Sequence, residues 1–573
     1  MTFPPYDRIV CSIALVTALS FCSEQPTDGP DARTEQPTQT DTTTAPADTL
    51  EALLHEHIAI LASDEFEGRA PATPGEELTV NYLREQFMKL GVAPGNEDSY
   101  FQPVEVTEIT AAGAPELTIQ GSDYAASFSY GDQQVVGSQQ QVPFVTVQGS
   151  DLVFVGYGIV SPERNWNDYA NTDVTDKTVI ILVNDPGYAT QNPAVFDGNA
   201  MTYYGRWTYK YEEAARQGAA AAIIVHETGP AGYGWEVVNN SWTGPQIGLT
   251  AANLNGDRAE IEGWITQETA EAVFDGAGLS YTELKQAAAQ PGFMATPMAD
   301  LTLNVSIENS VRTSLSQNVL AAIPGTTRSE ETIIYTAHWD HLGVDPTLEG
   351  DQIYNGASDN ATGTAGLLAL AQLHTQVPAP KRTVVFLAVT AEESGLLGSQ
   401  WYAEHPVYPI ARTVANINID NMNTVGRTRD VVVVGAGSSE LEDYLADAAG
   451  RQGRYVQSEP NPERGYYYRS DHFNFAKVGI PALYAESGED NIEFGRDYGA
   501  AQAEDYNENR YHQPSDEYRE SWDLSGAAED LRLYFDIGQR LANEQTFPEW
   551  YDGSEFKVIR DASSALRPGT DPQ

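Results

Sequence analysis

Short apolar runs recur through the second half of the chain and are separated by longer segments of mixed character. The runs TIIYTA, RTVVFLAVT, VANINI and DVVVV have the composition of buried strands. Between and after them, ATGTAGLLALAQLHTQ, SSELEDYLADAAGRQG and AAEDLRLYFDIGQRLANE carry apolar residues at three- and four-residue spacing, which predicts helices. Strands that alternate with helices predict an α/β fold with a doubly wound, mostly parallel sheet flanked by helices.

The first half of the chain has a different pattern. Residues 51–92 read as two helices joined by the loop EGRAPATPG. From about residue 145 to 290, strand-like runs such as KTVIILV stand among loops rich in Gly, Asn, Tyr and Trp. We therefore expect a β-rich domain at 145–290, inserted into a main domain formed by 51–144 and 291–550, with 551–573 as a C-terminal tail.

The amino-terminal residues predict export. Residues 9–22 form an apolar run too short to span a membrane, which is typical of a signal peptide ending at residue 22. The end of the run, ALSFC, resembles a bacterial lipoprotein box in which Cys22 carries the lipid, although Phe21 stands where a small residue is usual. Residues 23–50 are rich in Thr, Pro, Asp and Gln, which predicts a disordered linker. These features fit a lipoprotein of the periplasm or outer cell envelope, and they also fit a secreted protein.

Charge and cysteine content limit the chemistry. The chain has 32 Lys and Arg against 82 Asp and Glu, a net charge of −50, so we expect no nucleic-acid partner, since binding phosphate needs a basic surface. The two cysteines, Cys11 and Cys22, both lie near the amino terminus. The body of the chain therefore has no thiol nucleophile, and a metal site there would use His, Asp and Glu.

Histidines and carboxylates gather where the predicted strands and loops end. They are His338 after TIIYTA, Asp359 in NGASDNATG, Glu392 and Glu393 after VVFLAVT, Asp420 after VANINI and His512 in NRYHQPSDEY. Each alone fits an ordinary role, such as a helix cap, a turn or a solvated charge. Ligands bind beyond the carboxyl ends of parallel strands, so their joint placement predicts one site. Two histidines and three carboxylates form a donor set that zinc accepts.

Two adjacent glutamates at a strand end should not point the same way. One of them can bind a metal while the other faces a water molecule, which is the position of a general base. The stretch YTAHWDHLGV, residues 335–344, also places His338, Asp340 and His341 close together. Two interpretations of that stretch stay open. It holds either a metal ligand with its supporting carboxylate, or a polar strand end with a hydrogen-bonded histidine.

Five segments in order resemble peptidase family M28, the co-catalytic zinc exopeptidases that include bacterial aminopeptidases. The segments are HWDHLG, GASDNATG, AEESGLLGS, NINIDNMN and RYHQPSDEY, and the amino-terminal HIAILASDEFEGRAPATPG is also typical of the family. The resemblance covers about residues 51–545. The segment at 145–290, with LVFVGYGIV and AARQGAAAAIIV, looks like the protease-associated domain inserted in many members. The resemblance implies an enzyme that hydrolyses peptides or proteins with two zinc ions.

The resemblance also implies a role for each site residue. His338, Asp359, Glu393, Asp420 and His512 would bind the two zinc ions, with Asp359 bridging them and a non-proline cis peptide following it. Glu392 would be the general base and acid, Asp340 would orient His338, and Tyr511 would donate a hydrogen bond to the oxyanion. His341 and His472 are not ligands in the family, so His341 is expected to be structural.

Two other functions stay open within this fold. Glutaminyl cyclases are transferases that use one zinc ion, and some relatives bind peptides without catalysis. The complete set of five ligands together with Glu392 favours the exopeptidase. Side-chain preference and the choice between amino- and carboxy-end cleavage are not readable from the residues. We expect the inserted domain to carry no ligand and to filter substrates by size at one side of the entrance.

Overall fold

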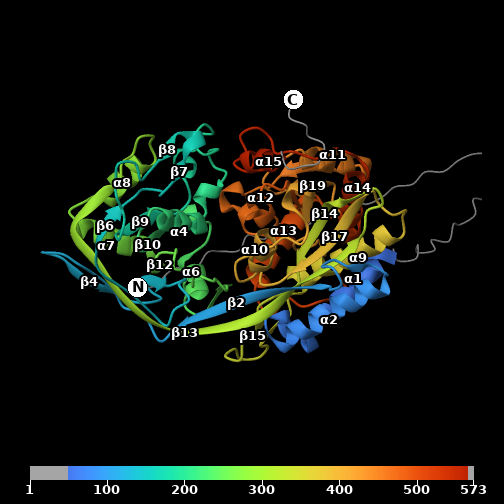
Figure 1. The fold of residues 1–573 in the computed structure, drawn as a ribbon, viewed down its shortest axis with the longest axis horizontal. Coiled ribbons are helices and arrows are strands. Elements are labelled where there is room, and N and C mark those ends of the chain that lie inside the picture. Colours follow the sequence, from blue (N-terminus) through green and yellow to red (C-terminus); the bar gives the residue numbers. More distant parts are fainter. Residues whose placement is uncertain (1–48, 565–573) are drawn as a thin grey trace, which may run out of the picture. The chain divides into compact units, whose positions relative to one another are not determined.

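The computed structural model describes residues 49–564 of the chain (Figure 1). The predicted signal peptide, the predicted lipid attachment at Cys22 and nearly all of the predicted linker lie outside the described residues. Within the described part, no helix is both long enough and apolar enough to cross a membrane.

A large mixed sheet flanked by helices forms the core of the main domain and confirms the α/β fold. Its strand order follows from the pairings. Strands β17, β14, β18 and β21 are parallel to one another at the centre, β13 runs antiparallel beside β17, and β2 pairs antiparallel with β13 on its other side. β19 and β20 extend the sheet beyond β21. The bounds are β2 (Phe101–Ala111), β13 (Thr296–Ile323), β14 (Arg328–His338), β17 (Arg382–Val389), β18 (Thr413–Asn418), β19 (Asp430–Val433), β20 (Tyr455–Ser458) and β21 (Ala482–Ser487).

Both faces of the central strands are buried, which is why these strands are apolar throughout rather than alternating. Along β14, Ile333 and Tyr335 belong to the core on the side of α1, α2, α9, α11 and α14. Ile334, between them, packs on the opposite side with Tyr402 and Phe475 of α10 and α12. The helix bounds are α1 (Thr49–Leu61), α2 (Pro74–Lys89), α9 (Thr362–Thr375), α10 (Leu397–Glu404), α11 (Leu441–Arg451), α12 (His472–Lys477) and α14 (Ser525–Asn543).

A second group of strands with its own hydrophobic core lies in the sequence between β2 and the end of β13. Its order is β4, β3, β13, β6, β9, β10, β12 and β5, of which β6, β9, β10 and β12 are parallel. The bounds are β3 (Leu117–Gln120), β4 (Ala125–Phe128), β5 (Gln134–Gly137), β6 (Phe144–Phe154), β9 (Thr178–Leu182), β10 (Ala221–His226) and β12 (Ile261–Thr266). Helices α4 (Trp207–Arg216) and α7 (Gln267–Gly276) contact β10.

The long strand β13 belongs to both groups. Residues 296–297 and 302–308 pair with β6, and residues 309–319 pair with β2. Figure 1 draws β13 as one long strand that runs from one group to the other. The second group therefore begins at Leu117 and ends inside β13, whereas composition predicts a domain at 145–290. Because one continuous strand passes from one group to the other, no change in composition marks the junction.

The carboxy-terminal residues predicted as a tail include a helix, α15 (Lys557–Ser564). The guanidinium of Arg560 donates hydrogen bonds to the carbonyl oxygens of Thr413 and Val414 in β18, at 3.0 and 3.2 Å. These bonds dock the end of the described chain against the start of a central strand.

Candidate metal centre

Three neighbouring parallel strands deliver the predicted site residues to one edge of the sheet. β14 ends at His338, which pairs in register with Val389 at the end of β17, and Glu392 and Glu393 follow that strand. β18 ends at Asn418 and is followed by Asp420. The edge where parallel strands end is where an α/β sheet binds its ligands.

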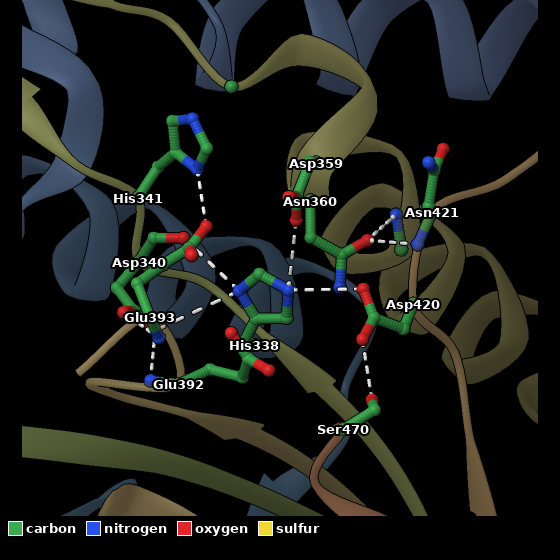
Figure 2. A network of polar contacts seen from close by, with 12 residues as sticks. His338, Asp340, His341, Asp359, Asn360, Glu392, Glu393, Asp420, Asn421 and Ser470 are labelled. Carbon is green, nitrogen blue, oxygen red and sulfur yellow. Dashed lines mark hydrogen bonds and ion pairs between the residues drawn. The ribbon is translucent and has the colours of Figure 1, made fainter. Parts of the chain in front are cut away.

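His338 stands between two carboxylates. Its Nε2 lies 3.2 Å from Asp359 Oδ1 and 3.2 Å from Asp420 Oδ1 (Figure 2). Ligand atoms of these three residues all lie within 4.8 Å of one another, which is close enough to share a metal ion. The structure therefore brings His338, Asp359 and Asp420 together as the first of two donor groups.

A second donor group lies on the other oxygen of Asp359. His512 Nε2 is 3.4 Å from Asp359 Oδ2 and 3.0 Å from Glu393 Oε2. This nitrogen is buried and has no aligned hydrogen-bond partner among the described residues. A nitrogen lone pair aimed between two carboxylate oxygens fits a metal ion better than it fits a hydrogen bond. Asp359 thus has one oxygen facing each histidine, which is the arrangement of a bridging ligand.

Asp359 lies in the turn Ala357–Ala361 that leads into α9. The peptide bond between Asp359 and Asn360 is cis, as the resemblance implies. The carboxylate of Asp516 accepts the backbone N–H of Asp359 at 3.1 Å and that of Ser358 at 3.0 Å. Asp516 lies in the same QPSDEY segment as the His512 motif, and sequence reasoning did not assign it a role.

Arg69 is a second supporting residue that sequence reasoning did not identify. Its buried guanidinium donates to four backbone carbonyl oxygens, those of Leu61, Trp339, Asn355 and Gly356, at 2.6–2.9 Å. These bonds connect the end of α1 to the residue after His338 and to the turn before Asp359. Only the position of Arg69 in the family-like segment EGRAPATPG could have pointed to it.

Asp340 contacts His338 at the end of β14 and the two glutamates that follow β17. Its carboxylate accepts the backbone N–H groups of Glu392 and Glu393, at 3.1 and 3.4 Å. His338 Nδ1 lies 3.2 Å from the backbone oxygen of Asp340 and 3.9 Å from its carboxylate. Asp340 therefore contacts His338 more closely through its main chain, and its carboxylate holds the Glu392–Glu393 backbone.

His341, which is expected to be structural, directly contacts one of the predicted metal ligands. Its Nδ1 is 2.6 Å from Glu393 Oε1, on the opposite oxygen from His512 (Figure 2). The ring is buried, and its Nε2 has no hydrogen-bond partner in the described chain. The spacing HWDH was the one signal for this contact.

His472, by contrast, is buried between the rings of Tyr467 and Tyr484, at centroid distances of 4.6 and 5.1 Å.

Two further contacts complete the geometry. Ser470 Oγ donates to Asp420 Oδ2 at 2.5 Å and accepts a hydrogen bond from Asn418, which fixes the carboxylate of Asp420. The ring of Tyr511 stacks on that of His512, with centroids 3.9 Å apart, and 38% of Tyr511 stays exposed. Tyr511 therefore borders the site on a solvent-accessible side.

The electrostatics of the site indicate a cation. Burial raises the pKa of Glu392 well above its usual value, and the charges of Glu393 and Asp420 act in the same direction. Burial alone would lower the pKa of His338, but Glu392 and Asp420 raise it well above its usual range. Four carboxylates around two histidines repel one another unless positive charge compensates them, and the oxygen and imidazole donors match zinc.

Comparison with known proteins agrees with this geometry. Residues 318–535 match the model of peptidase family M28. Aminopeptidase YwaD of Bacillus subtilis (strain 168) is 33% identical over 111 residues, which cover 19% of this chain and 22% of that protein. Aminopeptidase NAALADL1 of Mus musculus is 32% identical over 127 residues, covering 21% and 15%. These alignments thus span about a fifth of the relatives' own length or less.

Solved structures resemble the chain over a longer span. The aminopeptidase from Aneurinibacillus sp. strain AM-1 has 20% identity and a TM-score of 0.49, and covers 87% of this chain and 95% of its own. BSAP, a zinc aminopeptidase from Bacillus subtilis, has 18% identity and a TM-score of 0.41, with 87% and 96% covered.

The fold and the site define a peptidase-type α/β protein with a cluster of metal-binding residues at the carboxyl edge of its sheet. Residues 318–535 contain β14, β17 and β18 and all eight predicted site residues. This part of the chain matches peptidase family M28.

Proposed function

We propose that this chain is a zinc-dependent exopeptidase, of the aminopeptidase type, that binds two metal ions. The observation that carries the proposal is the position of Asp359, with Oδ1 at 3.2 Å from His338 and Oδ2 at 3.4 Å from His512. One carboxylate shared by two such groups is typical of sites that hold two ions about 3.5–4 Å apart.

In this proposal His338 and Asp420 would hold one ion, and His512 and Glu393 would hold the other. Asp359, between the two histidines, would be shared by both. When bound, the two ions would polarise the scissile carbonyl and acidify a water molecule. Asp340 keeps the Glu392–Glu393 backbone in position through its two N–H contacts.

Glu392 is the proposed general base and acid. It takes a proton from the attacking water and returns it to the leaving amine, so one carboxyl group serves both halves of the reaction. Its buried position beside Glu393 and Asp420 favours holding a proton, since each neighbouring negative charge makes the ionised form less stable. Tyr511, at the exposed border of the site, donates a hydrogen bond to the oxygen of the scissile carbonyl.

The segment between β2 and the end of β13 is proposed to be a protease-associated domain that limits access to the site. We further propose that the protein is exported, with residues 1–22 as the signal. Both proposals rest on sequence pattern. Replacement of Cys22 by Ala, followed by fractionation of the producing cell, separates a lipid-anchored protein from a secreted one.

The test is metal analysis of the purified protein together with an assay on aminoacyl-anilides and on peptides with free or blocked amino ends. Two zinc ions per chain and cleavage only of substrates with a free amino end are expected. One zinc ion per chain with cyclisation of amino-terminal glutamine would support a transferase instead. Cleavage only of peptides that have a free carboxyl end would contradict the aminopeptidase type.

A further inference from the structure

The segment that carries Glu392 and Glu393 starts with an unusual backbone conformation. Ala391, between the end of β17 and Glu392, has a φ of 53°, in the left-handed region that residues other than glycine rarely adopt. Leu396, at the other end of the segment, has a φ of 64°. A residue with a Cβ adopts this conformation at a cost, and it persists only where the surrounding structure enforces it. The contacts that enforce it therefore also set the direction in which the segment leaves the strand.

Asn318 of β13 holds the residue that precedes Ala391. The paired residues of β13 and β17 end at Val319 and Ala388. Beyond that point, the side-chain oxygen of Asn318 accepts the backbone N–H of Thr390 at 3.1 Å. Asn318 and Thr390 are both fully buried. A side chain of β13 thus continues the contact between the two strands up to the residue before Ala391.

The same amide closes the base of the segment. Asn318 Nδ2 donates to Gly398 O at 2.9 Å, and the N–H of Gly398 donates to Thr390 O at 2.9 Å. With the bond from Thr390 N–H, these contacts form a ring of three hydrogen bonds. A Cβ at Gly398 would lie 2.4–2.6 Å from atoms of Thr390 and Asn318, so only glycine permits this approach. Both ends of the segment are therefore fastened to one side chain.

A second side chain of β13 contacts Thr390 through its hydroxyl. Ser316 Oγ lies 2.6 Å from Thr390 Oγ1 and donates to Glu76 Oε2 at 2.8 Å. Because the hydroxyl proton of Ser316 goes to Glu76, Ser316 accepts the proton of Thr390. Ser316 is fully buried, and Glu76 is 5% exposed. Thr390 is thus held at its N–H, its carbonyl oxygen and its hydroxyl.

The residue on the other side of Ala391 is also held. The carboxylate of Asp340 accepts the N–H of Glu392 at 3.1 Å. Ala391 therefore lies between one residue fixed by β13 and another fixed by the turn after β14. A carboxylate oxygen of Glu392 lies within 4.8 Å of ligand atoms of His338 and Glu393. Rotation of Ala391 to a negative φ would turn the peptide that follows it and move this carboxylate.

We propose that Asn318 and Ser316 are positioning residues, which hold Ala391 in its left-handed conformation and so direct the Glu392 carboxylate into the metal-binding cluster. Neither residue touches the substrate in this proposal, and both act through Thr390. The inference rests on the proposed function of Glu392 and deepens it, because it says which residues keep the general base in place.

Asn318→Leu removes the ring of hydrogen bonds and nearly keeps the side-chain volume. Its kcat should fall about 10- to 100-fold, the loss expected for a small displacement of a reacting group, while KM and zinc content stay near the wild type. Asn416→Leu is the matched control, since Asn416 is also fully buried and donates to Thr336 Oγ1, within β18. A kcat that falls equally in both variants, or a loss confined to KM or zinc, would overturn the proposal.

Thr390→Val is a milder variant in case Asn318→Leu does not fold. It removes one hydroxyl bond, so kcat should fall about 3- to 10-fold. Thr383→Val, near the start of β17, is its control, because the Thr383 hydroxyl donates to Ser329 O at 2.7 Å. A kcat that is unchanged in Thr390→Val, or that falls equally in Thr383→Val, would contradict the role of Thr390.

Glycine at position 391 tests the conformation itself. Glycine adopts a positive φ without the penalty of a Cβ, so adding Ala391→Gly to Asn318→Leu should restore part of the lost kcat. A double variant with the kcat of Asn318→Leu, or a lower one, would show that Asn318 does not act by holding the left-handed conformation.

Hydrogen exchange tests the positioning independently of turnover. The N–H groups of Gly395 and Leu396 donate to Glu392 O at 2.9 and 2.8 Å. In zinc-loaded Asn318→Leu these amides should exchange about 10-fold faster than in the wild type, and in Asn416→Leu at the wild-type rate. If that difference appears while the wild type cleaves nothing, the proposed function fails and the positioning stands. If the exchange does not change, the positioning fails whatever the activity.

Discussion

The carboxylate of Asp340 accepts the backbone N–H of Glu392 at 3.1 Å. This bond ties the residue two positions after His338 to the strand end that carries the proposed general base. The same carboxylate reaches the N–H of Glu393 at 3.4 Å. Asp340 thus fixes the backbone of two neighbouring residues that have different proposed roles, Glu392 as the general base and Glu393 as a metal ligand.

Asp340→Asn should weaken both metal binding and turnover. The amide can accept from one N–H group but turns its own N–H₂ toward the other, so the Glu392–Glu393 backbone loses one of its two contacts. Residues that support metal ligands typically change metal affinity or activity by about 10- to 100-fold. Zinc affinity by competition with a chelator and kcat/KM are the measurements. Asp345→Asn, in the exposed part of the following loop, is the control, and equal behaviour of the two variants would contradict the role.

Substitution of Glu392 and substitution of Glu393 should have different effects on zinc content and on kcat. Glu392→Gln should fold and retain its zinc but lose about 10²- to 10⁴-fold in kcat, since the amide cannot accept the proton. Glu393→Gln should instead lose zinc, because Glu393 contacts His512 at 3.0 Å. Zinc content by elemental analysis and kcat are measured on both variants. Near-normal kcat in Glu392→Gln would show that another group is the base.

Arg69→Lys should destabilise the fold near the site. A lysine ammonium cannot reach all four carbonyl oxygens that the guanidinium contacts, and each buried carbonyl left without a donor costs about 1–3 kcal/mol. With two such groups lost, a decrease of about 3 kcal/mol in the free energy of unfolding is expected. The measurement is chemical denaturation of the zinc-loaded protein. Arg84→Lys on the surface of α2 is the control, and similar midpoints for the two variants would contradict the prediction.

Glu76 of α2 should make stability depend on pH. Burial raises the pKa of Glu76 from 4.5 to about 6, although hydrogen bonds from Ala72 and Ser316 oppose the shift. Because the folded pKa lies above the unfolded one, the contribution of Glu76 to stability is complete below pH 4.5 and is lost as the pH rises through 6. The shift corresponds to about 2 kcal/mol.

The test compares the wild type with Glu76→Gln by denaturation at pH 4.5 and pH 7.5. Gln cannot ionise, so the free energy of unfolding of the wild type relative to the variant should fall by about 2 kcal/mol between the two pH values. Glu77→Gln, at the exposed neighbouring position, is the matched control. A difference that does not change with pH would mean that Glu76 keeps the same charge at both values.

The strand ends of the site could be predicted from the chain alone. Apolar runs that end at His338, Glu392 and Asp420 imply parallel strands, and the carboxyl ends of such strands meet at one edge for geometric reasons. The residue types then limit the chemistry to a hard metal donor set. Those two arguments, with the family resemblance, account for the fold class and for the donor groups around Asp359.

The tertiary structure alone decided which distant side chains support and border that edge. Arg69 comes from the short segment between α1 and α2, and no local pattern marks its position. His341 was expected to be structural, yet its Nδ1 lies 2.6 Å from Glu393, because the rotamer and the packed turn set that distance. Periodicity and spacing determine which backbone segments are neighbours. The direction of each side chain depends on packing between segments far apart in the chain, and a linear pattern does not contain that information.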